Sequence, residues 1–151
     1  MQEIERKYLV EGESWREGIE ASFPISQGYL DVHGGATVRV RVKGEKAFLT
    51  IKGPSQGISR SEFEYGIPVE EAIEMIAQFC TSRCVEKIRH QVHVAGKLWV
   101  VDEFHGHNAG LVMAEIELES VDEKFEPPPW AGRDVSLDAA YYNVNLAKFS
   151  E

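Results

Sequence analysis

The chain opens with Met1-Gln2-Glu3-Ile4-Glu5-Arg6-Lys7-Tyr8-Leu9-Val10, the stretch that decides the fold. Charged residues recur at every second position from Glu3, which is typical of a β-strand with two unlike faces. In such a strand Glu3, Glu5 and Lys7 share one face and Ile4 lies on the other. Taken alone, this charged face is typical of a strand exposed to water.

The same arrangement recurs in each later segment that has a two-residue period. Within each segment, alternate positions form two sets whose side chains point to opposite faces, and we call each set a parity. Apolar residues such as Val40 and Ile116 occupy one parity, and charged residues occupy the other. The charged set is Glu3, Glu5, Lys7, Arg39, Arg41, Lys43, Lys52, Arg60, Glu62, Glu64, Arg83, Lys87, Arg89, Asp102, Glu115, Glu117 and Glu119. Such a sheet either keeps its charged face in water, or closes into a barrel whose charged face lines the inside and whose apolar outside is covered by helices.

The charged face is built from doublets of like charge: Glu-x-Glu, Arg-x-Arg and Lys-x-Arg. Like charges two apart on one strand face repel, so a doublet destabilises the sheet unless an opposite charge or a ligand lies between its members. Carboxylate doublets suit Mg²⁺ or Mn²⁺, and guanidinium or ammonium doublets suit phosphate oxygens. The pattern is therefore compatible with a metal–polyphosphate pocket, and equally with a solvated sheet.

The hydrophobic pattern predicts a mainly β, α+β fold with about eight strands, in a meander or a closed barrel. The expected strands cover residues 1–10, 25–32, 36–43, 46–52, 58–67, a segment from 83 onward, 98–104 and 111–120. The expected helices cover residues 12–21 with Ser14 as N-cap and Phe23-Pro24 as the end, 69–79, and 137–149. A hairpin turn is expected at His33-Gly34-Gly35, and an extended segment at Pro127–Trp130.

Composition narrows the class of protein. A chain of 151 residues is expected to form a single domain over 1–151, and a net charge of −9 argues against a general nucleic-acid surface. No apolar run approaches the ~18 residues of a membrane span, and the charged N-terminus does not resemble a secretory signal. Two cysteines, Cys80 and Cys84, are expected to be structural thiols of a cytoplasmic protein. His105 and His107 are expected in an exposed turn, and Trp99 in packing.

The charged segments resemble the CYTH superfamily, the triphosphate tunnel metalloenzymes. The resemblance begins at Glu3-Ile4-Glu5-Arg6-Lys7, which is similar to the family's Glu-x-Glu-x-Lys signature. It continues in order through Val38-Arg39-Val40-Arg41, Thr50-Ile51-Lys52, Glu62-Phe63-Glu64, Glu86-Lys87-Ile88-Arg89, Val101-Asp102 and Glu115-Ile116-Glu117. The pieces cover nearly the whole chain, which in its length looks most like the short bacterial members that hydrolyse inorganic triphosphate.

The resemblance implies an eight-stranded antiparallel β-barrel with inward-pointing charges, a few helices outside, and a C-terminal helix closing one mouth. It implies that one or two Mg²⁺ or Mn²⁺ ions are held by Glu3, Glu5, Asp102, Glu115 and Glu117. It implies that triphosphate is bound by Lys7, Arg39, Arg41, Lys52, Lys87 and Arg89, and that the catalytic residues are Lys7, Glu62, Glu64 and Lys87. Tyr141-Tyr142-Asn143 stands where many relatives are expected to carry a basic residue, which leaves a contact between this segment and phosphate open.

The function implied is metal-dependent hydrolysis of the terminal phosphate of inorganic triphosphate, with nucleoside and thiamine triphosphates as secondary substrates. Two alternatives are a class IV type adenylate cyclase and a non-catalytic polyphosphate- or nucleotide-binding module. A cyclase needs a nucleoside site, for which the chain shows no added element, and a pure binder should lack part of the metal-ligand set. The expected partner is a triphosphate-bearing small molecule, and neither nucleic acid nor a membrane is expected to bind. The protein itself is expected to be a monomer or a homodimer.

Overall fold

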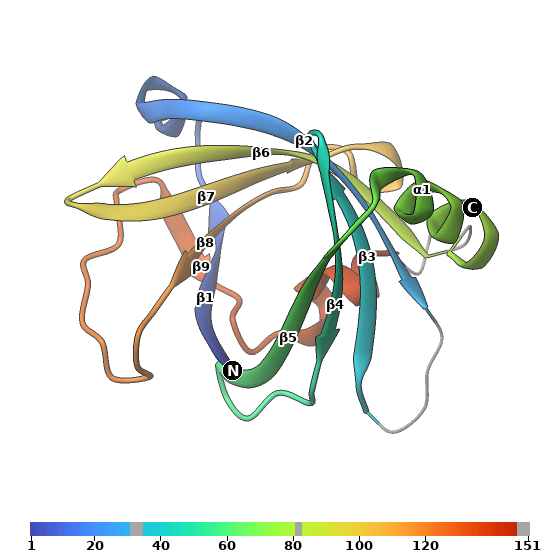
Figure 1. Ribbon diagram of the computed structural model, residues 1–151. Helices are drawn as coiled ribbons and strands as arrows, with labels where there is room; N and C mark the ends of the chain where they lie inside the picture. Colours follow the sequence, from blue (N-terminus) through green and yellow to red (C-terminus); the bar gives the residue numbers. More distant parts are fainter. Residues whose placement is uncertain (31–34, 81–82, 148–151) are drawn as a thin grey trace.

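Eight antiparallel strands close into a barrel in the computed structural model, which describes residues 1–30, 35–80 and 83–147 (Figure 1). The strands are β1 (Gln2–Val10), β2 (Ile19–Leu30), β3 (Thr37–Lys43), β4 (Lys46–Lys52), β5 (Ser59–Ile67), β6 (Cys84–Val94), β7 (Lys97–Phe104), β8 (Val112–Glu117) and a ninth, β9 (Ala131–Asp134). The helices are α1 (Val69–Phe79) and α2 (Asn143–Leu146), with 3₁₀ turns η1 (Ser14–Gly18), η2 (Gly106–Asn108) and η3 (Ala139–Tyr141). The predicted mainly β barrel with a few helices is confirmed.

Strand β1 closes the barrel by dividing its edges among three partners. Its first residues pair with β5, as in Glu3 opposite Arg60, and its later residues pair with β8, as in Glu5 opposite Glu117. Its last residues also pair with the short strand β9, which the sequence analysis did not predict. The remaining strands follow in the order β5-β4-β3-β2-β6-β7-β8. The N-terminal stretch therefore holds both sides of the barrel together.

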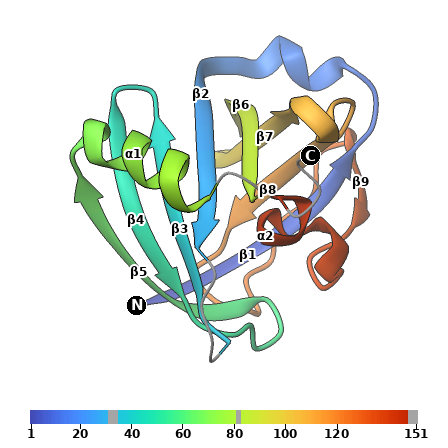
Figure 2. The same ribbon diagram turned by 90° about the vertical axis from the view of Figure 1, so that its right-hand side faces the viewer.

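The apolar face of the sheet points outward and is covered in two places. Trp15, Trp99 and Trp130 pack in one buried cluster over the outside of the β1–β8 region, where Trp99 and Trp130 meet edge to face at 5.6 Å between ring centroids. Helix α1 covers a different part of the barrel, over β2, β3 and β4, where Ala72 is fully buried (Figure 2). Burial of this apolar area stabilises the barrel, and it leaves the charged parity facing inward.

The C-terminal segment is less helical than predicted. Instead of one helix over 137–149, the chain forms η3 and the four-residue α2, and residues 148–149 lie outside the described part. Leu146 and Val144 pack with Phe104 and Val135 at one end of the barrel. This apolar contact places the segment beside the barrel interior, where Tyr142, Asn143 and Val144 line the cavity.

Strand β2 begins at Ile19 and runs through Phe23-Pro24, which the sequence analysis wrongly took as the end of a helix. Pro24 sits opposite Ile88 in a long ladder with β6. The first helical turn is 3₁₀ and its N-cap is Glu13, so the assignment of Ser14 as N-cap was also wrong. Most of the expected turn at residues 33–35 falls outside the described residues.

In the described part of the chain, no helix has the length and apolar character needed to cross a membrane.

Candidate active site

The barrel encloses a cavity of about 300 Å³ that is lined mainly by charged side chains. Those charged residues are Glu3, Glu5, Lys7, Arg39, Arg41, Lys43, Lys52, Arg60, Glu62, Glu64, Lys87, Arg89, Glu115 and Glu117. Every strand from β1 to β8 except β2 and β7 contributes to this set, because each presents its inward parity to the cavity. Basic side chains outnumber acidic ones here, although the chain as a whole carries a net charge of −9. The interior therefore favours an anionic ligand.

One wall of the cavity is acidic and lies along β1 and β8. Glu5 faces Glu117 in the strand register, with Glu115 two residues away on the same face. Burial raises the pKa of Glu5 to about 7, and the charge of Glu115 adds to this rise. Desolvation and the charges of Glu3 and Glu5 also raise the pKa of Glu117. On this wall, burial and mutual repulsion therefore disfavour the charged carboxylates, and a bound cation would favour them.

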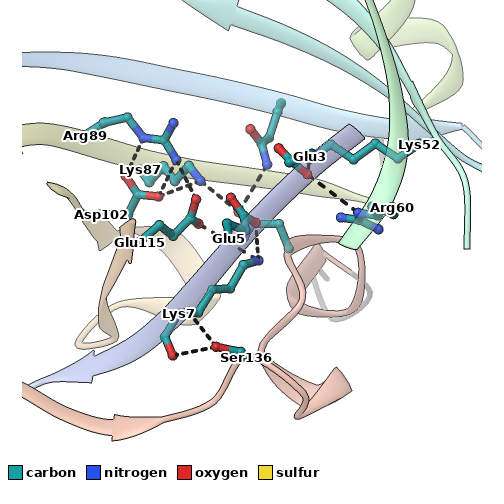
Figure 3. Close-up of polar contacts among 12 residues, drawn as sticks. Glu3, Glu5, Lys7, Lys52, Arg60, Lys87, Arg89, Asp102, Glu115 and Ser136 are labelled. Carbon is teal, nitrogen blue, oxygen red and sulfur yellow. Dashed lines mark hydrogen bonds and ion pairs between the residues drawn. The ribbon is translucent and has the colours of Figure 1, made fainter. Parts of the chain in front are cut away.

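Glu115 differs from its neighbours because two cations flank it. Its carboxylate lies 3.9 Å from Lys7 Nζ and 3.7 Å from Arg89 Nη2 (Figure 3). Burial alone would raise the pKa of Glu115, but Lys7 and Arg89 outweigh it and hold the pKa well below its usual range. Burial likewise disfavours the Lys7 ammonium, while Glu115 and Glu5 more than compensate and raise the pKa of Lys7. Both groups are therefore charged at neutral pH.

The part of the lining on β3, β4 and β5 holds cations already paired with carboxylates. Lys52 Nζ donates to Glu3 Oε1 at 2.8 Å and lies 3.2 Å from Glu62 Oε2. Arg39 Nη2 lies 3.6 Å from Glu64 Oε1. Glu62 and Glu64, expected as catalytic carboxylates, are thus within reach of the cavity and bound to basic partners.

Two arginines on β3 retain unsatisfied capacity for an anion. The buried Nε of Arg39 has no hydrogen-bond partner among the described residues. Arg41 donates from Nε to Gln27 Oε1 at 2.7 Å, and no described carboxylate lies within 4 Å of its guanidinium. Burial, together with the charges of Arg39 and Arg89, lowers the pKa of Arg41 to about 9. A phosphate group between these side chains would satisfy both.

Asp102, expected among the metal ligands, lies beneath the basic wall and does not line the cavity. It is 1% exposed, and its two oxygens accept from Arg89 Nε at 2.8 Å and Arg89 Nη2 at 2.9 Å. Lys87 Nζ also lies 2.8 Å from its Oδ2 (Figure 3). Despite burial, which would raise it, the pKa of Asp102 is held far below its usual range by Arg89 and Lys87. The structure therefore separates Asp102 from the acidic wall, because two buried cations already occupy its oxygens.

Lys87 is the most deeply buried cation of the site, at 2% exposed. Burial lowers its pKa to about 7; Asp102 opposes this fall, while Arg89 and Arg41 add to it. Its Nζ also donates to Asn143 Oδ1 at 2.9 Å and lies 5.3 Å from the centre of the Phe104 ring. An amine with this pKa can exchange a proton near neutral pH.

Several lining residues were missed by sequence reasoning. Tyr29, Tyr142 and Asn143 line the cavity, and Gln27 contacts Arg41 behind it. Extending the two-residue parity along β2 would have found Gln27 and Tyr29. No local pattern marks Tyr142 and Asn143, because their place depends on how the C-terminal segment folds back. Lys43 and Arg83 share the charged face in the sequence pattern but are not among the expected site residues; Lys43 lines the cavity and Arg83 does not.

A divalent cation fits this site by donor chemistry. Among residues 1–30, 35–80 and 83–147, no three carboxylate, thiol or imidazole groups already form a metal-binding cluster. Glu3, Glu5 and Glu117 nevertheless share one wall and supply the hard oxygen ligands that Mg²⁺ and Mn²⁺ prefer. Burial, and then repulsion by neighbouring glutamates, raises the pKa values of Glu5 and Glu117, and a bound cation would offset both causes.

Comparisons with known proteins agree with this geometry. Residues 1–147 match the family model described as CYTH domain. An inorganic triphosphatase of Acetivibrio thermocellus is 44% identical over 146 residues, covering 97% of this chain and 93% of that protein. An inorganic triphosphatase of Nitrosomonas europaea is 38% identical over 151 residues, covering 97% of both.

Solved structures with a similar fold include an inorganic triphosphatase. The crystal structure of the inorganic triphosphatase NE1496 has a TM-score of 0.71 and 35% identity, covering 97% of this chain and 94% of that one. A putative adenylate cyclase from Vibrio parahaemolyticus, with 20% identity and a TM-score of 0.57 over 80% of this chain and 78% of that one, resembles it in fold alone.

Proposed function

The chain belongs to the CYTH domain family, and we propose that it is a divalent-metal-dependent enzyme that hydrolyses the terminal phosphate of inorganic triphosphate. One observation carries this proposal. One predominantly basic cavity contains Arg39, whose Nε has no hydrogen-bond partner in the described residues, and Arg41, which has no carboxylate partner there; Glu5 and Glu117 form an acidic wall of the same cavity. A polyphosphate bound with a divalent cation is complementary to both walls. The names of the two triphosphatase relatives support the same substrate class.

In this proposal the triphosphate lies along the basic wall. Its binding residues are Lys7, Arg39, Arg41, Lys52, Lys87 and Arg89, all of which line the cavity. Arg39 and Arg41 would bind phosphate oxygens through guanidinium nitrogens. The phosphate would in turn neutralise positive charge that the chain's own carboxylates leave unmatched. Lys52 is shared with Glu3 and Glu62, so phosphate binding would compete with existing ion pairs there.

Glu3, Glu5, Glu115 and Glu117 would hold one or two Mg²⁺ or Mn²⁺ ions. When bound, the cation supplies charge neutralisation at the phosphate oxygens. We assign Asp102 to a different task from the one that the resemblance implied. With both oxygens occupied by Arg89 and Lys87, it holds these two side chains in place beneath the phosphate.

Phosphoryl transfer needs an aligned water molecule and stabilisation of developing charge. Lys87, with a pKa of about 7, would take the proton of the attacking water as its oxygen forms a bond to the terminal phosphorus. The bridging oxygen bond breaks and the leaving pyrophosphate gains negative charge, which Lys7 and Arg39 stabilise. Glu62 and Glu64 orient the water in this scheme, from positions held by Lys52 and Arg39.

The test is phosphate release with Mg²⁺ or Mn²⁺ from triphosphate, pyrophosphate, ATP and thiamine triphosphate in parallel. We expect triphosphate to be the best substrate and the nucleoside and thiamine triphosphates to be slower, because the charged lining offers little to a base or ribose. Formation of cyclic AMP from ATP would overturn the proposal in favour of a cyclase. Tight triphosphate binding without turnover would indicate a binding module. The free thiols of Cys80 and Cys84 suit a cytoplasmic setting for this activity.

A further inference from the structure

Two buried amides connect the C-terminal segment to the basic wall. Asn143, the first residue of α2, accepts at Oδ1 from Lys87 Nζ at 2.9 Å and from Gln27 Nε2 at 3.1 Å. Gln27 in turn accepts at Oε1 from Arg41 Nε at 2.7 Å, and its Nε2 also donates to the Tyr29 hydroxyl at 2.9 Å. Gln27 is fully buried and Asn143 is 9% exposed. These bonds are therefore sheltered from water, which makes the loss of a partner costly.

The polarity of this chain of bonds is determined by its ends. Arginine and a charged lysine can only donate hydrogen bonds, so the atoms that meet them must be carbonyl oxygens. Gln27 must therefore turn its oxygen to Arg41 and its NH₂ group to Asn143. Asn143 must turn its oxygen to both Gln27 and Lys87. Neither amide can flip without placing two donors against each other.

The two amides restrict how each cation can meet a ligand. The Lys87 ammonium has three donors; one points to Asp102 and one to Asn143, with the Phe104 ring on a further side. The third position on Nζ is left for the cavity, which Lys87 lines: in the ammonium it donates to a ligand, and in the neutral amine it is the lone pair that accepts the proton of the attacking water. Arg41 uses Nε for Gln27, so its two terminal nitrogens remain for phosphate oxygens.

We propose that Gln27 and Asn143 form a positioning pair that orients Arg41 and Lys87 toward the triphosphate, so that the C-terminal segment is part of the active site. The inference rests on the proposed triphosphatase function. At the segment where many relatives are expected to carry a basic residue, this chain would instead use Asn143 to orient a lysine of the barrel wall. Asn143 does not contact phosphate itself but acts through Lys87.

A purely structural role for Asn143 would be to hold the segment in place, yet other contacts already do so. Asn108 Nδ2 donates to the Leu146 carbonyl oxygen at 3.1 Å, and Asn145 Nδ2 donates to the Ala139 carbonyl oxygen at 2.6 Å. Leu146 also packs in the apolar cluster at this end of the barrel. Removing the Asn143 amide should therefore leave the segment docked.

The experiment compares variants by steady-state kinetics with triphosphate and Mg²⁺ and by thermal melting. Asn143→Leu keeps the size of the side chain and removes the acceptor, and we expect kcat to fall by about 10- to 100-fold with little change in Tm. Asn143→Asp keeps an acceptor oxygen and should recover most of the lost kcat. Asn145→Leu is the matched control on the same helix, and it should lower Tm while leaving kcat unchanged.

A double-mutant cycle tests whether the two amides act as one unit. Gln27→Met should raise KM through Arg41 and lower kcat through Asn143, and adding Asn143→Leu should lower kcat by far less than the product of the single effects. An unchanged kcat in Asn143→Leu, a loss that only follows Tm, or no recovery in Asn143→Asp would each overturn the inference. A wild-type protein that releases no phosphate from triphosphate would overturn the proposed function, and this inference with it.

Discussion

Glu5 and Glu117 lie directly opposite each other across the β1–β8 ladder, as two carboxylates in one antiparallel register. Like charges in this position destabilise a sheet. The nearest cation to Glu5 is Lys7, whose Nζ is 3.7 Å from its Oε1, and Glu117 has no ion pair within the described residues. The barrel therefore holds together a repulsive pair that a bound divalent cation would stabilise.

The stability of the metal-free protein should depend on the ionisation of Glu5. Its folded pKa is raised to about 7, so between about pH 4.5 and pH 7 the folded state binds a proton that the unfolded state releases. This contribution to stability is present at low pH and is lost as the pH rises through 7. Urea unfolding in chelator should show a loss on the order of 1–3 kcal/mol between about pH 5 and pH 8.

Glu5→Gln should remove this part of the pH dependence, because the amide does not titrate. Glu74→Gln, on the exposed face of α1, serves as the control and should keep the wild-type profile. If Glu5→Gln shows the same loss of stability as the wild type, another group is responsible.

Activity should require a divalent cation that binds at the acidic wall. Glu117→Gln removes one charged oxygen donor, so the Mg²⁺ concentration for half-maximal rate should rise by about tenfold or more. The measurement is triphosphate hydrolysis against Mg²⁺ concentration, with Glu74→Gln again as control. Turnover that survives exhaustive chelation would contradict the prediction.

Replacing Asp102 should act on stability more than on the metal. Asp102→Asn leaves Lys87 and Arg89 buried without their shared counter-charge, and breaking a buried ion pair costs about 3–5 kcal/mol. Chemical denaturation should report this loss, while the Mg²⁺ dependence of the remaining activity stays close to that of the wild type. A large shift in Mg²⁺ dependence at unchanged stability would return Asp102 to the metal-ligand set.

Arg39→Ala should weaken substrate binding while the protein stays folded. Charge-assisted hydrogen bonds contribute about 1.5–3 kcal/mol, so KM for triphosphate should rise by roughly 10- to 150-fold. Within the part of the chain that the structure describes, the polar partners of the Arg39 side chain are Thr50 and Glu64, and its Nε has none, which leaves Nε for the ligand. Lys46→Ala removes an exposed cation at the start of β4 and should leave KM unchanged. Equal KM values for the two variants would place Arg39 outside the binding site.

Metal and triphosphate should stabilise the protein together by more than the sum of their separate effects, since each neutralises one wall of the same cavity. Ligands that bind only the folded state stabilise it by about 2.7 kcal/mol at a hundredfold excess over Kd. Melting should be measured with Ca²⁺ or a non-hydrolysable analogue to limit turnover. Glu115→Gln should reduce the cooperativity, because Glu115 lies between Lys7 and Arg89. Additive shifts in the wild type would mean that the walls do not share a ligand.

The alternation of Glu3, Glu5 and Lys7 was enough to predict the strand and its charged face, because period two is a property of the backbone. The two-residue period does not, however, tell how far an inward-pointing side chain lies from the cavity. Asp102 has the same parity as the cavity-lining Val100, yet it ends up under Arg89 and Lys87. Parity gives the direction of a side chain, and only packing gives its distance from the ligand.

The errors in the predicted fold and the missed lining residues also come from contacts that are not local. Pro24 is typical of a break, but the ladder between β2 and β3 begins only at Ile25, so at Pro24 the strand has β6 as its one ladder partner in the described residues and the missing N–H is tolerated. Asn143 carries no local signal, because its partners Gln27 and Lys87 are 116 and 56 residues away in the sequence. Long-range contacts of this kind become visible only when the whole chain is folded.

The division of β1 among three partners has a consequence for the order in which the protein can be made. Its residues near Glu5 and Lys7 pair with β8 and its last residues pair with β9, whose final residue is Asp134. During synthesis the first residues of β1 can pair with β5 once residues 59–61 have left the ribosome, but the ladders with β8 and β9 must wait for residues 113–134. Closing so long a loop is slow compared with forming local helices. Strand β1 is therefore fully placed only late, and the pair of carboxylates from Glu5 and Glu117 cannot form before β8 has been made.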